Sequence, residues 1–191
     1  LGKDFFLSLD VAASEFYNNK KYKILSEKKS FSSDQFSDYL IKLCKKYSII
    51  SLEDPFAEDD WKAWQKFNHN YGSEIQVVGD DIFTTNIDLI SKGIKMKAAN
   101  AVLIKVNQIG TLTETMKAIE LAQMNSLETV ISHRSGETEN TFISDLSVAT
   151  NSGQIKTGSM SRSDRTAKFN QLIRIEEFFN SKKSLKINKF Y

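Results

Sequence analysis

Residues Ala101–Val106 read AVLIKV, an apolar run interrupted only by Lys105 near its end. Short runs of this kind, bounded by polar residues, are typical of strands that are buried on both faces of a parallel sheet. Five further runs are predicted as strands: Phe5–Asp10, Ile49–Glu53, Ile75–Asp80, Glu128–Ser132 and Gln154–Lys156. We therefore predict six strands.

Helical patterns lie between these strands. The clearest is predicted over Asp34–Tyr47, where apolar residues recur at steps of three and four after a capping box of Ser32 with Gln35. A second box, Thr111 with Glu114, opens another helix. Three aromatic residues share one face of a further predicted helix and are expected in the core: Trp61, Trp64 and Phe67.

Strands that alternate with helices form either an open doubly wound sheet or a closed eight-stranded barrel. Nearly every predicted strand ends in or beside a residue able to do chemistry: Asp10, Glu53, Asp80, Lys105, His133 and Lys156. Barrels gather their active sites from the carboxyl ends of many strands, whereas an open sheet concentrates its site at one crevice. The pattern favours an α/β fold, a partial TIM (β/α) barrel with about six βα units and two strands short of eight.

Composition narrows the classes of protein and of partner. The 191 residues include 26 basic and 24 acidic side chains, for a net charge of +2, so no strong field for nucleic acid or a membrane surface is expected. The single cysteine, Cys44, allows no intramolecular disulfide, which favours a reducing compartment. No run approaches the roughly 20 apolar residues of a membrane span, and no signal peptide opens the chain. We expect a cytoplasmic protein.

Three acidic residues at strand ends suggest a metal site. Asp10, Glu53 and Asp80 would converge on one rim, and three hard oxygen ligands with open positions suit Mg²⁺. Any one of them alone would more often be a helix cap or a solvated charge. The joint pattern favours a Mg²⁺ site.

Basic residues would supply the rest of the chemistry. An unpaired ammonium is costly inside the apolar run of Lys105, which favours the neutral amine, and a neutral amine can act as a general base. A structural lysine is the simpler alternative for this residue alone. Arg134 offers two-pronged binding of phosphate, with the Ser135 hydroxyl beside it, and His133 and Lys156 lie at the same rim. A serine hydrolase has less support, because no Gly-x-Ser-x-Gly elbow occurs. Nucleotide-binding loops and zinc-ligand spacing are also missing from the sequence.

The motifs around these residues resemble those of the enolases. The resemblance runs from Phe5 to about Phe179, in the order and at the spacing of that family. It is carried by Leu9–Phe16, Ser51–Pro55, Val78–Asp81, Leu103–Thr111, Ser132–Glu139, Gly153–Gly158 and Asn170–Glu177. It implies the carboxy-terminal part of an enolase-type TIM barrel over residues 1–180, with a lysine-rich tail at 181–191.

The resemblance implies a glycolytic lyase, phosphopyruvate hydratase, that converts 2-phosphoglycerate to phosphoenolpyruvate and water. Asp10, Glu53 and Asp80 would hold one Mg²⁺, and a second Mg²⁺ would arrive with the substrate phosphate. Lys105 would remove the C2 proton, and Lys156 would stabilise the intermediate. His133, Arg134 and Ser135 would bind the substrate, and Asp81 would support the metal ligands. The acid for the departing hydroxyl lies upstream in that family, so this chain alone is expected to be inactive.

Two other functions stay open. The chain or its parent could be a non-catalytic binding module, in an RNA-processing assembly or on the cell surface, as Lys182, Lys183, Lys186 and Lys189 suggest. A solvated tail is the simpler interpretation of these lysines. A related enzyme could abstract a proton from an acid that lacks phosphate, although Arg134 and Ser135 argue against it. The resemblance also implies a homodimer or a larger oligomer for the complete protein.

Overall fold

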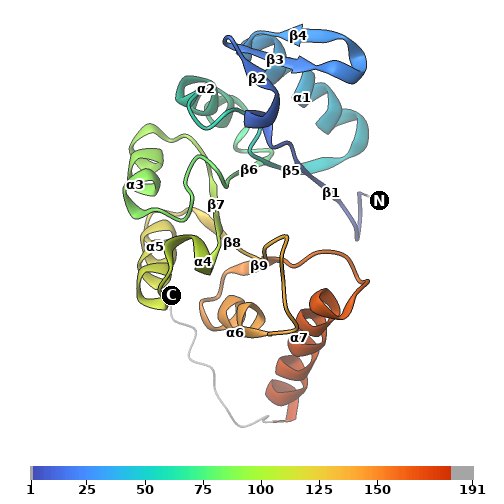
Figure 1. The fold of residues 1–191 in the computed structure, drawn as a ribbon, viewed down its shortest axis with the longest axis vertical. Coiled ribbons are helices and arrows are strands. Elements are labelled where there is room, and N and C mark those ends of the chain that lie inside the picture. Colours follow the sequence, from blue (N-terminus) through green and yellow to red (C-terminus); the bar gives the residue numbers. More distant parts are fainter. Residues whose placement is uncertain (1, 182–191) are drawn as a thin grey trace. The chain divides into compact units, whose positions relative to one another are not determined.

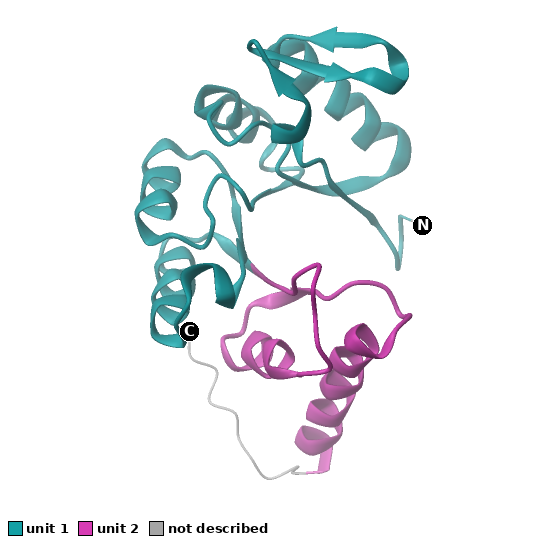
Figure 2. Ribbon diagram, viewed as in Figure 1, with its two compact units in different colours: residues 1–129 teal, residues 130–191 magenta. Residues whose placement is uncertain are grey.

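The computed structural model describes residues 2–181, which belong to two compact units, Leu1–Thr129 and Val130–Tyr191 (Figure 1, Figure 2). Strands alternate with helices through both units, so the predicted α/β class is confirmed. Ser181 ends the last helix, and the other residues of the predicted tail, with Lys182, Lys183, Lys186 and Lys189, lie outside the described residues.

The six predicted strands are present, and their order in the sheet follows the sequence. They are β1 (Leu7–Asp10), β5 (Ile49–Glu53), β6 (Gln76–Gly79), β7 (Ala101–Ile104), β8 (Glu128–Ser132) and β9 (Gly153–Lys156). The pairs β1–β5, β5–β6 and β6–β7 are parallel. Sequential parallel strands joined by helices are those of a (β/α) barrel, here with six of its strands. The partial barrel is therefore confirmed.

Two of the strands end earlier than predicted. The chain turns at Asp80, whose carbonyl accepts hydrogen bonds from Phe83 N and Thr84 N. Lys105 is the N-cap of a short helix, α4 (Val106–Ile109). Both residues therefore stand at the point where a strand passes into a turn, which is where barrel enzymes place their functional side chains.

Longer helices follow the strands in both units. In the first unit they are α1 (Ser33–Tyr47), α2 (Trp61–Tyr71), α3 (Ile87–Met96) and α5 (Leu112–Met124), and in the second α6 (Phe142–Ala149) and α7 (Ser163–Ser181). The predicted capping box of α1 is present, since Ser32 accepts from Gln35 N and the Gln35 side chain accepts from Ser32 N. Thr111 likewise caps α5 by accepting from Glu114 N. None of the helices among residues 2–181 is long and apolar enough to cross a membrane.

Most of the predicted aromatic face of α2 lies in the core of the first unit. Trp64 and Phe67 are 0% and 1% exposed, and Phe67 packs edge-on against Phe56. Trp61 differs, because it is only partly buried and the Lys92 ammonium lies 3.8 Å from the centre of one of its rings. A cation over an indole face is favourable, so this partly buried tryptophan supports the exposed Lys92 instead of packing fully into the core.

A small antiparallel sheet was not predicted. It consists of β2 (Tyr17–Asn18), β3 (Lys21–Ile24) and β4 (Lys29–Phe31), beside α1 in Figure 1. Asn19 and Lys20 form its first turn with positive φ angles, a backbone form that suits tight hairpins. Tyr22 fixes this sheet to the core, because it is fully buried and its ring stacks on Phe36 at 4.5 Å.

Candidate active site

Strand register places four predicted site residues on one face of the first unit's sheet. Asp10 pairs with Glu53, Glu53 with Val78, and Val78 with Ala101. Paired residues of parallel strands face the same side, and every second residue along a strand returns to that side. Asp80 lies two residues beyond Val78, and Lys105 lies four beyond Ala101. The alternation therefore assigns Asp10, Glu53, Asp80 and Lys105 to the same face, at the carboxyl end of each strand.

Lys105 and Asp80 form a close ion pair at this edge. Lys105 Nζ lies 2.5 Å from Asp80 Oδ2, and the two side chains are 16% and 11% exposed. The backbone of Lys105 is also held in place, because its N–H donates to Thr85 Oγ1 at 3.0 Å. Thr85 is fully buried and donates in turn to Gln108 Oε1. The Lys105 backbone is thus fixed by the turn that follows β6, and the attraction within the pair is little screened by solvent.

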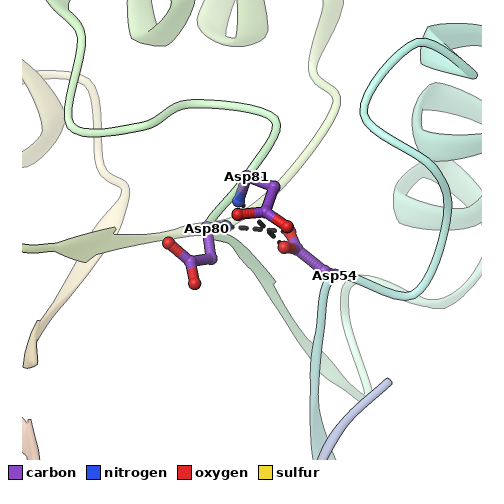
Figure 3. A group of neighbouring side chains, drawn as sticks. All are labelled: Asp54, Asp80 and Asp81. Atoms are coloured by element: carbon purple, nitrogen blue, oxygen red, sulfur yellow. Dashed lines mark hydrogen bonds between the residues drawn. The ribbon is translucent and has the colours of Figure 1, made fainter. Parts of the chain in front are cut away.

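Asp54 anchors the turn that carries Asp80 and Asp81 (Figure 3). Its Oδ1 accepts from Asp80 N at 2.9 Å, and its Oδ2 accepts from Asp81 N at 2.8 Å. Burial, and after it the charges of Asp80 and Asp81, raise the pKa of Asp54 to about 8, against the two backbone hydrogen bonds that lower it. Burial and Asp80 raise the pKa of Asp81 as well. These carboxylates crowd one another, so positive charge beside them is favourable.

The carboxylate geometry fits a hard cation. Ligand oxygens of Asp54, Asp80 and Asp81 all lie within 4.8 Å of one another. In Figure 3 the carboxylates of Asp54 and Asp81 lean toward each other, whereas that of Asp80 points away from them. Asp80 Oδ1 is buried and has no hydrogen-bond partner in the described part of the chain. A buried carboxylate oxygen without a hydrogen-bond donor is energetically costly, and a bound cation would offset that cost.

This cluster shares one residue, Asp80, with the predicted metal ligands. Glu53, which is 6% exposed, lies on β5, the strand next to the one that leads to Asp80. The exposed Asp10 pairs with Glu53 and lies one strand further away, on β1. Their role as ligands stays a prediction. The role of Asp54 as the anchor of the turn was not predicted. Its place directly after Glu53 in the sequence does not reveal that its oxygens accept hydrogen bonds from the backbone of Asp80 and Asp81.

The other four predicted site residues belong to the second unit. His133, Arg134 and Ser135 follow β8, and Lys156 ends β9. The two segments are joined where His133 N donates to Lys156 O at 2.9 Å. Burial and the charge of Arg165 lower the pKa of His133 below its ordinary value of 6.5. His133 is therefore a neutral imidazole at neutral pH.

Two residues of α7 hold the segment after β8, and the sequence did not point to either. The Arg165 guanidinium is 2.5 Å from His133 Nδ1 and donates to the carbonyls of Arg134 and Ser135, each at 2.9 Å. Lys168, which is fully buried, donates to Glu137 Oε2 at 2.7 Å. Their spacing of three places both on one face of the helix, and this spacing was the available signal.

The sequence matches that of a known protein family. The family model described as enolase, C-terminal TIM barrel domain, matches residues 2–190. This match covers nearly the whole chain, both units included. It agrees with the partial (β/α) barrel fold. The chain belongs to the enolase family, as its C-terminal TIM barrel domain.

Proposed function

We propose that the complete protein is a phosphopyruvate hydratase, a lyase that interconverts 2-phosphoglycerate and phosphoenolpyruvate with Mg²⁺. The observation that carries this proposal is the ion pair of Lys105 with Asp80, whose second oxygen is buried and has no hydrogen-bond partner in the described residues. The Asp80 carboxylate thus contacts the proposed base through one oxygen and could bind a cation through the other. This is the arrangement that proton removal beside a substrate carboxylate needs.

Lys105 is the proposed base. In the ion pair it is an ammonium, which cannot accept a proton. Asp10, Glu53 and Asp80 would hold the cation, so Lys105 would share the Asp80 carboxylate with it. The neutral amine would then take the C2 proton of 2-phosphoglycerate. Bound Mg²⁺ would supply positive charge opposite the substrate carboxylate, where negative charge grows as the proton leaves.

Residues of the second unit would bind the anionic substrate. Arg134 can donate two parallel hydrogen bonds to phosphate, and the Ser135 hydroxyl can add a third. Lys156 would stabilise the negative charge of the intermediate. The departing hydroxyl needs a proton, and the resemblance assigns that acid to residues upstream of Asp10. The complete protein is accordingly the form in which turnover is expected, as a dimer or larger oligomer.

The experiment compares two classes of substrate. The complete protein, with Mg²⁺, is given 2-phosphoglycerate, and phosphoenolpyruvate is followed by its ultraviolet absorbance. Matched 2-hydroxy acids without phosphate form the second panel. Turnover confined to the phosphorylated acid is expected. Turnover confined to the acids that lack phosphate would identify a different reaction of the same superfamily, and turnover of neither would favour a binding role.

A further inference from the structure

Arg165 faces His133 through an atom pair that fixes where the imidazole proton resides. Arg165 Nη1 lies 2.5 Å from His133 Nδ1. A guanidinium has five N–H donors, no acceptor, and no accessible neutral form. Nδ1 must therefore accept this hydrogen bond, and it can do so only while it carries no proton. The proton of the neutral ring then resides on Nε2.

We propose that Arg165 is a positioning residue that holds His133 as the neutral Nε2–H tautomer, so that His133 offers an uncharged hydrogen-bond donor to an oxyanion of the substrate. The tautomer itself follows from the contact and needs no assumption about the reaction. Only the role toward substrate rests on the proposed function.

The guanidinium cannot easily turn away from the ring. Arg165 is 8% exposed, and it also donates to the carbonyls of Arg134 and Ser135. The Asp164 carboxylate lies 3.4 Å from its Nε. Gly158, with φ +84°, lies against both partners, since a Cβ at that position would be 2.9 Å from Arg165 Cδ and 3.1 Å from His133 Cε1. Only glycine lets the chain approach so closely.

The charges around His133 also disfavour a second proton on the ring. Arg165, Lys156 and Lys168 are cations that lower the pKa of His133, after burial, which is the largest cause. Glu137 is the acidic group that opposes them, and its carboxylate is engaged by Lys168 at 2.7 Å. Protonation at Nδ1 would in addition set two N–H groups against each other at hydrogen-bond distance. His133 is thereby suited to donate a hydrogen bond and unsuited to deliver a proton.

The test reads the tautomer directly. Long-range ¹H–¹⁵N correlation spectra of the complete protein distinguish Nδ1–H, Nε2–H and doubly protonated rings, and the His133→Asn variant assigns the signal. We expect the Nε2–H pattern at neutral pH, persisting below pH 6.5. In Arg165→Gln the titration midpoint should move up toward the ordinary value. Arg165→Lys, which keeps a charged donor, should preserve the pattern. Arg174→Gln, on an exposed turn of the same helix, should change nothing.

Turnover gives the second readout. In Arg165→Gln we expect KM for 2-phosphoglycerate to rise about tenfold, as for the loss of one hydrogen bond to a charged group, with a smaller change in kcat. An Nδ1–H or doubly protonated ring in the unaltered protein at neutral pH would overturn the proposal. So would an unchanged His133 titration in folded Arg165→Gln. Because the spectra need no substrate, lack of turnover in the unaltered protein would refute the proposed function and leave the tautomer standing.

Discussion

The two oxygens of the Asp80 carboxylate differ, and this difference determines how the Lys105–Asp80 pair should respond to a bound cation. One oxygen takes the Lys105 ammonium at 2.5 Å, and the other is buried with no hydrogen-bond partner in the described residues. In the absence of a cation the lysine is what neutralises the carboxylate. With a cation bound, the two positive charges compete for it. The lysine should therefore stabilise the metal-free protein and weaken its affinity for the metal.

Replacement of Lys105 by Met tests this competition. Without divalent cation we expect Lys105→Met to lower the free energy of unfolding by about 3 kcal/mol, because a mostly buried carboxylate loses its counter-charge. Mg²⁺ should bind the variant more tightly than the unaltered protein and recover more stability in it. Urea denaturation across a Mg²⁺ titration measures both effects.

The exposed pair of Lys66 with Asp34 supplies the matched control. Its atoms are 2.8 Å apart, but its side chains are 61% and 72% exposed. Lys66→Met should have little effect on stability, because solvent screens such pairs, and none on Mg²⁺ affinity. A Lys105→Met variant that binds Mg²⁺ more weakly than the unaltered protein would show that the lysine and the cation do not compete.

At the scale of elements, helix α7 holds the segment after β8 through two buried side chains three residues apart. Lys168 is fully buried and donates to Glu137 Oε2, to Asp164 O at 2.6 Å and to Thr138 O. Glu137 Oε1 accepts in turn from Arg134 N at 3.2 Å. The helix is in this way linked, through one carboxylate, to the backbone of a proposed phosphate ligand.

Lys168→Met should destabilise the second unit. We expect a loss of about 3 kcal/mol, since Glu137 would keep its charge without its partner. Hydrogen exchange should accelerate at amides of residues 130–181 and stay unchanged in the first unit. The double variant with Glu137→Gln should be less damaged than the single one, and Arg174→Met should be neutral. Equal acceleration of exchange in both units would contradict the prediction that the Lys168 contacts stabilise the second unit alone.

At the scale of the whole chain, the two units should respond to acid in opposite directions. The pKa of His133 is lowered below 6.5, by burial and then Arg165. Its contribution to stability is complete above 6.5 and is lost as the pH falls through the folded value. Burial raises the pKa of Glu137, but hydrogen bonds from Lys168 and Arg134 N outweigh it, and the net value lies below 4.5. This contribution is also lost in acid.

Asp54 has the opposite sign, in the first unit. Burial raises its pKa from 3.8 to about 8, so its contribution is greatest in acid and is lost as the pH rises through about 8. Without divalent cation, a change from neutral pH to about pH 5 should therefore slow hydrogen exchange around Asp54 and speed it around His133, after correction for intrinsic rates. Faster exchange around both residues would contradict these signs.

The strands, the barrel class and the residues at the strand ends were predictable because buried parallel strands are apolar runs, in which Lys105 or Asp80 is conspicuous. The β2–β4 sheet was missed because its strands are two to four residues long and largely polar. Arg165 and Lys168 were missed because a basic residue in a helix is usually solvated. Their partners come from a distant loop, which spacing along the chain does not reveal. Trp61 fitted a core pattern but instead supports Lys92.

The most direct test of the central claim is Mg²⁺-dependent conversion of 2-phosphoglycerate to phosphoenolpyruvate by the complete protein and by its Lys105→Met variant. We expect turnover in the unaltered protein and a loss of about 10³-fold in the variant, the scale at which a general base contributes. The variant should still fold and bind Mg²⁺. Full activity without Lys105, or an unaltered protein that acts only on acids without phosphate, would contradict the assignment.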